Sequence, residues 1–289
     1  MANSIQLSKV YTNLLDEVYQ QSALTAVLES DASLAREGAN TNEIIIPKLS
    51  MDGLADYSRN SGYVNGDVSL VWETVKFNYE RGRMFSVDNM DNEETQNIAF
   101  GRLAGEFIRT QVVPELDAFR FATYAATTGA GTATGTLATG VDVINALRVA
   151  TSAMDEAEVP MEDRHLFITP TLLGLVEDMD TTKSKEVLAR FASIIKVPQT
   201  RFYSVIELLD GKSSGEEKGG YKKADLGVEL NFEIIHKPAV LQFTKHAVPK
   251  VISPELNQDA DAWKYGYRNN GLCDTYENKA AGIYVHKKA

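Results

Sequence analysis

Two segments in the first half of this chain are too long for a compact globule of its size. Ser69–Val87 reads as one continuous strand, which at about 3.3 Å per residue would span roughly 60 Å. Asp91–Thr128 reads as one helix interrupted only by Pro114, and at about 1.5 Å per residue it would span roughly 57 Å. A globule of 289 residues has a radius of gyration of about 19 Å. The two lengths therefore indicate an assembly subunit, which rests long elements on other copies of itself, before they indicate an enzyme.

The bulk composition excludes several classes of protein. Apolar residues make up 44% and charged residues 24%, as in an ordinary soluble protein. No apolar run approaches the roughly 20 residues that span a bilayer, and the N-terminus carries no secretory pattern, so we expect synthesis in the cytoplasm. Cys273 is the single cysteine, which rules out an intrachain disulfide. The net charge of −11 argues against broad nucleic-acid affinity, although a weakly repulsive wall can still enclose a polyanion.

The segments on both sides of residue 60 predict an extended hairpin. Asn42–Leu49 reads as a strand, and Pro47 places it at a sheet edge because proline donates no ladder hydrogen bond. Ser50–Asp67 is rich in Gly, Asp, Asn and Ser, which is typical of an irregular loop. The long strand Ser69–Val87 then returns. Because an isolated apolar hairpin is marginal in water, we expect a neighbouring copy to cover it; a sheet of the same subunit is the alternative.

The predicted long helix has an acidic start and a proline in its middle. Asp91, Glu93 and Glu94 suit the positive end of the helix dipole. Pro114 removes one backbone hydrogen bond and is the candidate hinge; the alternative is a break into two helices. Upstream, Ser4–Leu28 has helical apolar spacing and reads as an N-terminal arm, with packing on its own core as the alternative.

The rest of the chain reads as a mixed α+β domain. Thr127–Gly140 is a Gly/Ala/Thr loop and the candidate domain boundary, and Asp210–Asp225 is a solvated loop. The remaining predicted elements are helices at Val141–Glu158, Pro170–Met179 and Ser184–Ile195, and strands at Arg164–Thr169, Arg201–Ile206, Val228–His236, Ala239–Phe243 and Gly282–His286.

No motif supports catalysis, a cofactor or a metal. Residues 211–215 match G-x-S-x-G, but a polar loop follows instead of a helix, and the glycine that a phosphate-binding loop needs is replaced by Ile206. The histidines have no second ligand at metal-binding spacing; they are His165, His236, His246 and His286. A lysine–asparagine isopeptide bond between copies has only formal candidates, which are Lys48, Lys76, Asn269, Asn270 and Asn278.

Several extended strings resemble one known family, the major capsid proteins of tailed bacteriophages with the Hong Kong 97-type fold, in a branch common among phages and prophages of Gram-positive bacteria. The similarity covers nearly the whole chain. The strings that carry it are Ile45–Tyr63, Val71–Thr74, Arg81–Glu94, Ala104–Phe121, Asn257–Lys264, Tyr267-Arg268 and Gly282–Lys288.

The resemblance implies a named α+β architecture. An N-arm at residues 1–36 would precede an extended β-hairpin loop (E-loop) at 37–87. A peripheral domain at 88–139 and 246–289 would contain the spine helix, and an axial domain would occupy 140–245. The implied function is closed self-assembly into the icosahedral head that encloses double-stranded DNA. The alternatives are an encapsulin-type nanocompartment shell and, further off, an enzyme on a mixed α+β fold.

The implied partners are many copies of the same chain in hexamers and pentamers, a scaffolding protein, a portal and, for some heads, a decoration protein. The chain would enclose DNA without reading its sequence, would not bind membranes, and would reside in the virion after assembly in the host cytoplasm. No catalytic, cofactor or metal residue is implied. The candidate intersubunit contacts are Asp52, Asp56, Arg59, Trp72, Arg81 and Arg83.

Overall fold

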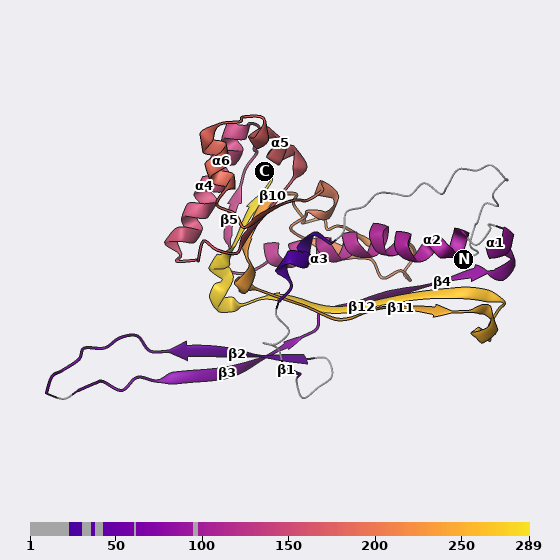
Figure 1. Ribbon diagram of the computed structural model, residues 1–289, viewed down its shortest axis with the longest axis horizontal. Coiled ribbons are helices and arrows are strands. Elements are labelled where there is room, and N and C mark those ends of the chain that lie inside the picture. The colour runs from indigo at the N-terminus through magenta and orange to yellow at the C-terminus, as the bar shows by residue number, and fades with distance from the viewer. Residues whose placement is uncertain (1–22, 31–35, 38–42, 61, 95–97) are drawn as a thin grey trace.

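The computed structural model describes residues 23–30, 36–37, 43–60, 62–94 and 98–289. Figure 1 shows a mixed α/β unit at one end, a long helix lying along a three-stranded sheet, and a hairpin that projects away from both. None of the described helices is long and apolar enough to cross a membrane. The chain is therefore extended rather than globular, as the lengths of its predicted elements indicated.

The helices are α1 (Asn89–Glu94), α2 (Ile98–Phe107), α3 (Val113–Ala125), α4 (Gly140–Glu156), α5 (Pro170–Glu177) and α6 (Thr182–Leu188). The strands of the first half are β1 (Arg36–Glu37), β2 (Glu43–Met51), β3 (Val68–Lys76), β4 (Tyr79–Asp88) and β5 (Gly131–Thr134). Those of the second half are β6 (Arg164–Ile168), β7 (Ser193–Lys196), β8 (Ile206–Leu208), β9 (Tyr221–Lys223), β10 (Leu230–His236), β11 (Val240–Ile252), β12 (Ala262–Thr275) and β13 (Ile283–Lys287).

The projecting hairpin is built from β2 and β3, which pair antiparallel along their whole length from Glu43↔Lys76 to Met51↔Val68. The short β1 pairs only with Ile44 and Ile45. Pro47, which lies beyond β1, therefore faces an edge without a backbone partner from β1. The predicted strand and the irregular loop after it are confirmed. The predicted edge position is not, because β2 is the middle strand of the order β1-β2-β3, and only its part beyond Ile45, with Pro47, has no β1 partner.

The prediction of one continuous strand over Ser69–Val87 is wrong, because the chain changes sheets at Asn78. The Asn78 side chain donates to the carbonyl of Cys273 (2.7 Å) and accepts from its N–H (3.1 Å). These two side-chain hydrogen bonds replace the backbone hydrogen bonds between strands at residue 78. β4 then continues in a different sheet, of order β11-β12-β4, and the hairpin ends at Lys76 instead of residue 87.

The long helix is continuous from Ile98 to Ala125, a span of about 42 Å. Between α2 and α3 lies a π-helical turn, Ile108–Val112, and Pro114 follows in the first turn of α3. A proline ring would collide with the carbonyl four residues earlier, and the wider π turn accommodates it. Pro114 thus does not split the helix, and its role as a hinge stays a prediction.

The mixed α/β unit is organised around a five-stranded sheet of order β5-β13-β10-β6-β7. The central strand β10 is buried along its entire length. One face of the sheet packs on α4, α5 and α6 through a cluster that includes Leu147, Leu173 and Ile234. The other face packs on α3 through a cluster that includes Phe121, Tyr124 and Ile235. The end of the long helix is therefore part of this core.

Strand pairing connects segments that lie on both sides of the domain boundaries implied by the resemblance. β5 and β13 lie in the same sheet as β6 and β10, so divisions at residues 139 and 246 would cut that sheet. Thr127–Gly140 is accordingly not only a loop, because it contains β5. The C-terminal strand β13 pairs with β10, and the division into peripheral and axial domains stays a prediction.

Three other predictions in the second half are also corrected. The predicted helix Ser184–Ile195 ends at Leu188, and its last residues belong to β7. The predicted strand Arg201–Ile206 is a short 3-10 turn followed by β8. The long strand β12 was not predicted at all. Its middle carries Asn269, Asn270 and Gly271, residues of low strand propensity, and pairing on both sides by β11 and β4 overrides that propensity.

Glu233 is an exception in this apolar core. It lies at the centre of β10 with no exposed surface, and neither carboxyl oxygen has a hydrogen-bond partner among the described residues. Burial raises the pKa of this carboxyl well above its usual range, and only Lys287 opposes the shift. Glu233 is therefore held as a neutral acid in the folded subunit.

Glu233→Gln is expected to flatten the pH dependence of subunit stability. Because the folded-state pKa lies above the unfolded value, Glu233 destabilises the fold increasingly as the pH rises from about 4.5 towards the folded pKa. The glutamine cannot ionise, so the variant should gain stability over the native chain between pH 5 and pH 8, and it should gain most at the higher pH. Urea midpoints across this range measure the effect. The exposed Glu186→Gln is the control, and equal pH profiles for all three proteins would contradict the assignment.

Candidate functional site

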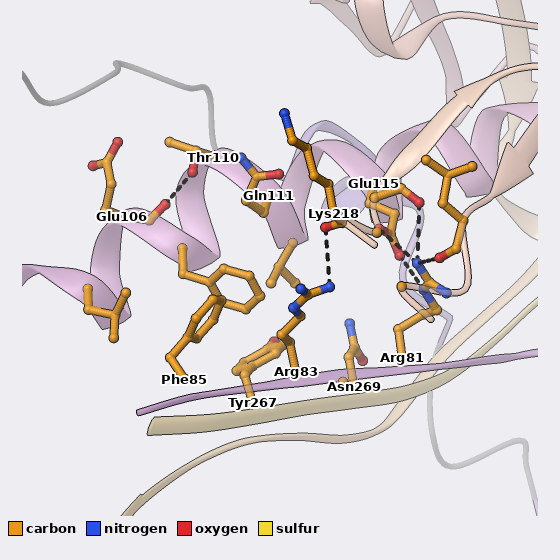
Figure 2. A pocket seen from close by; sticks show the side chains of 18 of the residues that line it. Arg81, Arg83, Phe85, Glu106, Thr110, Gln111, Glu115, Lys218, Tyr267 and Asn269 are labelled. Carbon is orange, nitrogen blue, oxygen red and sulfur yellow. Dashed lines mark hydrogen bonds and ion pairs between the residues drawn. The ribbon is translucent and has the colours of Figure 1, made fainter. Parts of the chain in front are cut away.

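A hollow lies where a strand, the long helix and a loop of the described chain meet. It encloses about 710 Å³ between β4, the long helix and the loop of residues 209–220 that joins β8 to β9. We call this hollow the pocket, and Figure 2 shows it from close by. Its size is within the range of known binding sites, roughly 300–1,000 Å³.

The floor of the pocket is aromatic. Phe85 of β4 and Phe107 of α2 meet edge to face, with ring centroids 4.8 Å apart. Tyr267 of β12 lies 6.3 Å from Phe107 in a similar arrangement. These three rings come from three elements, so the floor exists only because the helix crosses the sheet at this point. In Figure 2, Phe85 and Tyr267 point from the sheet towards the helix.

Arg81 closes one end of the pocket and joins its three walls. Its Nε donates to Glu115 of α3 (2.7 Å), and its Nη2 donates to the carbonyls of Leu209 (2.7 Å) and Gly220 (3.3 Å). The Tyr79 hydroxyl also donates to Glu115 (3.2 Å). Burial, followed by the Glu115 charge, raises the pKa of Tyr79 far above its usual range, so the phenol remains a neutral donor. The 209–220 loop is thus fastened to the helix and to β4.

Arg83 fastens the tip of the same loop. Its guanidinium donates to the carbonyls of Glu217 (3.0 Å) and Lys218 (3.2 Å). Gly211 and Gly219 both have positive φ, and a Cβ on either would lie 3.0 Å from an Arg83 nitrogen. Both positions therefore need glycine for conformation and for the close approach of Arg83.

The two arginines were predicted to pair with carboxylates of neighbouring copies. The structure instead gives Arg81 a carboxylate partner within its own subunit and gives Arg83 two carbonyl partners there. Glu115, which completes this arrangement, was missed by sequence reasoning. A usable signal was present: two acidic residues, Glu115 and Asp117, alternate with apolar residues directly after Pro114. Contacts of Arg81 and Arg83 with a neighbouring copy stay a prediction.

The other predicted contact residues lie on the hairpin, far from the pocket of the same subunit (Figure 1). Asp52 accepts a hydrogen bond from the N–H of Asp67 (2.8 Å) and so closes the base of the loop. Asp56 and Arg59 are exposed on that loop, and Trp72 is 44% exposed on β3. The structure does not bring these four residues together with Arg81 and Arg83, and their intersubunit role stays a prediction.

A buried polar cluster, also missed from sequence, holds the N-terminal segment on the core. The fully buried Asp117 of α3 pairs with Arg201 (3.0 Å). It also accepts hydrogen bonds from the N–H groups of Leu24 (3.1 Å) and Thr25 (3.2 Å) and from the Thr25 hydroxyl (2.8 Å). Leu28 is completely buried beside them. The alternative in which the arm packs on its own core therefore holds for residues 24–28; the arm before residue 23 lies outside the described residues.

Glu115→Ala is expected to destabilise the subunit by about 2 kcal/mol, because it leaves the half-buried Arg81 without its carboxylate and Tyr79 without its acceptor. Glu80→Ala, next to Arg81 on β4, is the matched control. It breaks the ion pair between Glu80 and Arg268, whose side chains are mostly exposed, and should cost less than about 1 kcal/mol. Urea unfolding measures both, and equal losses would show that the Arg81 arrangement is no stronger than a surface pair.

The described residues contain few groups that could bind a metal or act as a nucleophile. No group of three His, Cys, Asp or Glu side chains among them could hold a metal ion. Cys273 is buried, and burial raises its pKa to about 12, so its thiol is not a nucleophile at neutral pH. What the site offers instead is shape: an aromatic hollow in one place and an exposed apolar hairpin in another.

Comparison with solved structures identifies the fold. The mature capsid of bacteriophage PhiM1 superposes with a TM-score of 0.63 at 10% identity over 99% of this chain and 92% of that one. The capsid of Cyanophage P-SCSP1u gives 0.62 at 12% identity over 98% and 93%. A virus-like particle from Pyrococcus furiosus gives 0.55 at 13% identity over 91% and 96%. The chain has the fold of these phage capsid proteins. Its sequence matches no protein-family model and no curated protein.

Proposed function

We propose that this chain is the major capsid protein of a tailed bacteriophage or prophage, which assembles into the icosahedral shell that encloses the double-stranded DNA genome. The observation that carries the proposal is the whole-length likeness to capsid subunits, at 92–99% coverage on both sides. The projecting apolar hairpin supports it independently, because a hairpin of this kind is covered only in an assembly.

The subunit would be held in the shell by several moderate interfaces, each burying the usual area of about 800 Å² per partner. The hairpin β2–β3 would be the E-loop that lies over a neighbouring copy, and α2–α3 would be the spine helix. The sheet around β10 would belong to the axial domain, with β5 and β13 included. The segment before β1 would be the N-arm. A scaffolding protein, a portal and a decoration protein are the further partners that this role implies, with assembly in the host cytoplasm.

The second candidate is a protein-filled compartment with the same fold. It is supported by the likeness to the virus-like particle from Pyrococcus furiosus, whose TM-score of 0.55 is lower than the 0.62–0.63 of the phage capsids. A catalytic role has no support in the described residues beyond scattered histidines and the inert Cys273, so the proposal assigns no enzymatic activity.

Negative-stain electron microscopy of the purified chain, alone and with its scaffolding partner, tests the proposal. Closed shells of uniform diameter are expected. Nuclease-resistant DNA inside particles from infected or induced cells would favour the capsid, and protein cargo without DNA would favour the compartment. Dispersed particles of the size of a single chain under both conditions would overturn both readings.

A further inference from the structure

We propose that the pocket binds a small aromatic carboxylate, whose ring packs on the aromatic floor and whose charge is bound by Arg83. The proposal goes beyond the proposed function and does not depend on it, because every group that carries it belongs to one folded subunit. It assigns a class of ligand to a hollow of about 710 Å³. Small-molecule sites of this size are mostly apolar, with a few polar groups that fix the orientation of the ligand.

The sheet side of the pocket brings aromatic, cationic and amide groups together. Arg81, Arg83 and Phe85 alternate along β4 and line the pocket. On the neighbouring strand β12, Tyr267 lies opposite Arg83, and Asn269 lies opposite Arg81. Residues two apart on a strand share a face, and directly opposed residues have Cβ atoms about 4.5–5.5 Å apart. One ligand can therefore contact the ring of Tyr267, the guanidinium of Arg83 and the amide of Asn269 at the same time.

The aromatic floor has ring surface left for a ligand. Phe85, Phe107 and Tyr267 all line the pocket, and each is only partly buried. Phe107 meets each of the other two rings edge to face. A further ring can pack on them in the offset or edge-to-face arrangements that aromatic pairs prefer, and such pairs gain more than their buried area alone gives. The floor therefore favours an aromatic ligand over a saturated one of similar size.

Arg83 provides the positive charge for the carboxylate. A guanidinium has five N–H donors, and the carbonyls of Glu217 and Lys218 accept from two of them. No carboxylate of the described residues pairs with Arg83. The donors that remain can bind a ligand carboxylate, and hydrogen bonds between two ionised groups are the strong ones. Lys218 adds a second, exposed cation, and Figure 2 shows its side chain rising from the loop.

The acidic side chains that line the pocket are already engaged. Glu115 pairs with Arg81, and Glu106 pairs with Arg109. Asp210 accepts hydrogen bonds from groups of its own loop. The charge that stays without a partner at the pocket is therefore positive, and electrostatic complementarity selects an anion over a cation.

Asn269 is a second, independent indication of a ligand. It is only 4% exposed and lines the pocket, yet its side-chain amide makes no hydrogen bond to another described residue. Buried polar side chains in native proteins nearly always have a partner. In Figure 2 the amide of Asn269 and the guanidinium of Arg83 both point from the sheet towards the helix. A carboxylate bound by Arg83 can therefore also accept a hydrogen bond from Asn269.

Equilibrium dialysis of the full-length chain against 2-naphthoate tests the proposal. We expect one site per chain with a dissociation constant below about 1 mM, as for a ligand of this size. Two analogues separate the contributions. The amide 2-naphthamide keeps the rings and lacks the charge, so it should bind at least about tenfold more weakly. The saturated decalin carboxylate keeps the charge and lacks the aromatic rings, and it should also bind more weakly than naphthoate.

Two variants and a matched control locate the ligand. Arg83→Met removes the charge at the pocket, and Leu103→Trp fills the hollow from α2. Arg268→Met is the control, because it removes a mostly exposed guanidinium from β12. Arg268 lies directly before Asn269 and therefore on the opposite face of the sheet. Circular dichroism and urea midpoints establish that each variant is folded.

Arg83→Met should bind naphthoate at least about tenfold more weakly than the native chain and should bind naphthamide as the native chain does. A merely structural role of Arg83 would weaken both ligands equally. Leu103→Trp should lose both ligands, and Arg268→Met should bind both normally.

Three results would overturn the proposal: no saturable binding of naphthoate to the native chain up to about 1 mM, equal affinities for naphthoate and naphthamide, or a loss in Arg268→Met as large as in Arg83→Met. None of these results concerns the formation of shells, so the proposed function would stand or fail by its own test.

Discussion

Asp117→Ala is expected to destabilise the folded subunit by about 3–5 kcal/mol, the usual cost of leaving one member of a buried ion pair alone. Arg201 would remain buried, with 1% of its side chain exposed and without its carboxylate. Leu24 and Thr25 would lose the acceptor of their backbone N–H groups. Because most domains have only about 5–15 kcal/mol to lose, a change of this size should lower the unfolding midpoint strongly.

Urea unfolding of the dissociated subunit measures the loss, and Glu207→Ala is the matched control. Glu207 pairs with Lys222 at 2.8 Å, but more than half of each side chain is exposed, so its removal should cost less than about 1 kcal/mol. Hydrogen exchange adds a local readout, since protection at Leu24 and Thr25 should disappear in Asp117→Ala alone. Equal losses in the two variants would contradict the view that Asp117 joins the N-terminal segment, α3 and Arg201.

Replacement of residues 52–67 by Asn-Gly is expected to abolish closed shells while leaving the subunit folded. Met51 and Val68 face each other at the end of the hairpin, so a two-residue turn can close the ladder without strain. The tip of the hairpin projects away from the body (Figure 1), and its removal should leave the unfolding midpoint unchanged. The shell, however, would lose the contact between copies that we propose for the hairpin.

Electron microscopy together with sedimentation measures this outcome. A second variant separates the reach of the tip from its chemistry: it keeps all residues of the tip but carries Leu54→Ser, Tyr63→Ser and Val64→Ser. If the apolar contact holds the shell, this variant should fail in the same way, or should form shells that dissociate at lower denaturant. Closed and stable shells from the Asn-Gly variant would show that the tip does not hold the assembly together.

The predictions that succeeded depend on residues close together in the sequence. The apolar stretch around Pro47 predicts a strand, the Gly- and Asp-rich loop at 50–67 predicts an irregular connection, and helical apolar spacing before and after Pro114 predicts a long helix. Each is a property of a few neighbouring residues, so it can be read without knowing the fold. The resemblance to capsid proteins added the identity of the elements, and the solved structures agree with it in fold.

The predictions that failed depend on partners distant in the sequence. The long strand was split because Asn78 bonds to Cys273, 195 residues away. β12 forms in spite of its Asn and Gly residues because two long strands pair with it. Isolated propensities contain no information on either contact, since tertiary pairing supplies the larger energy.

The same distinction between local and distant contacts applies to the candidate site. The sequence by itself determined that this chain has a hairpin with a Gly- and Asp-rich connecting loop and a long helix around Pro114, because turn residues and helical periodicity act locally. Only the tertiary structure decided that Arg81 binds Glu115 and the 209–220 loop within the subunit, and that Phe85, Phe107 and Tyr267 line one hollow. These groups come from separate elements, and the crossing of helix, sheet and loop alone brings them together.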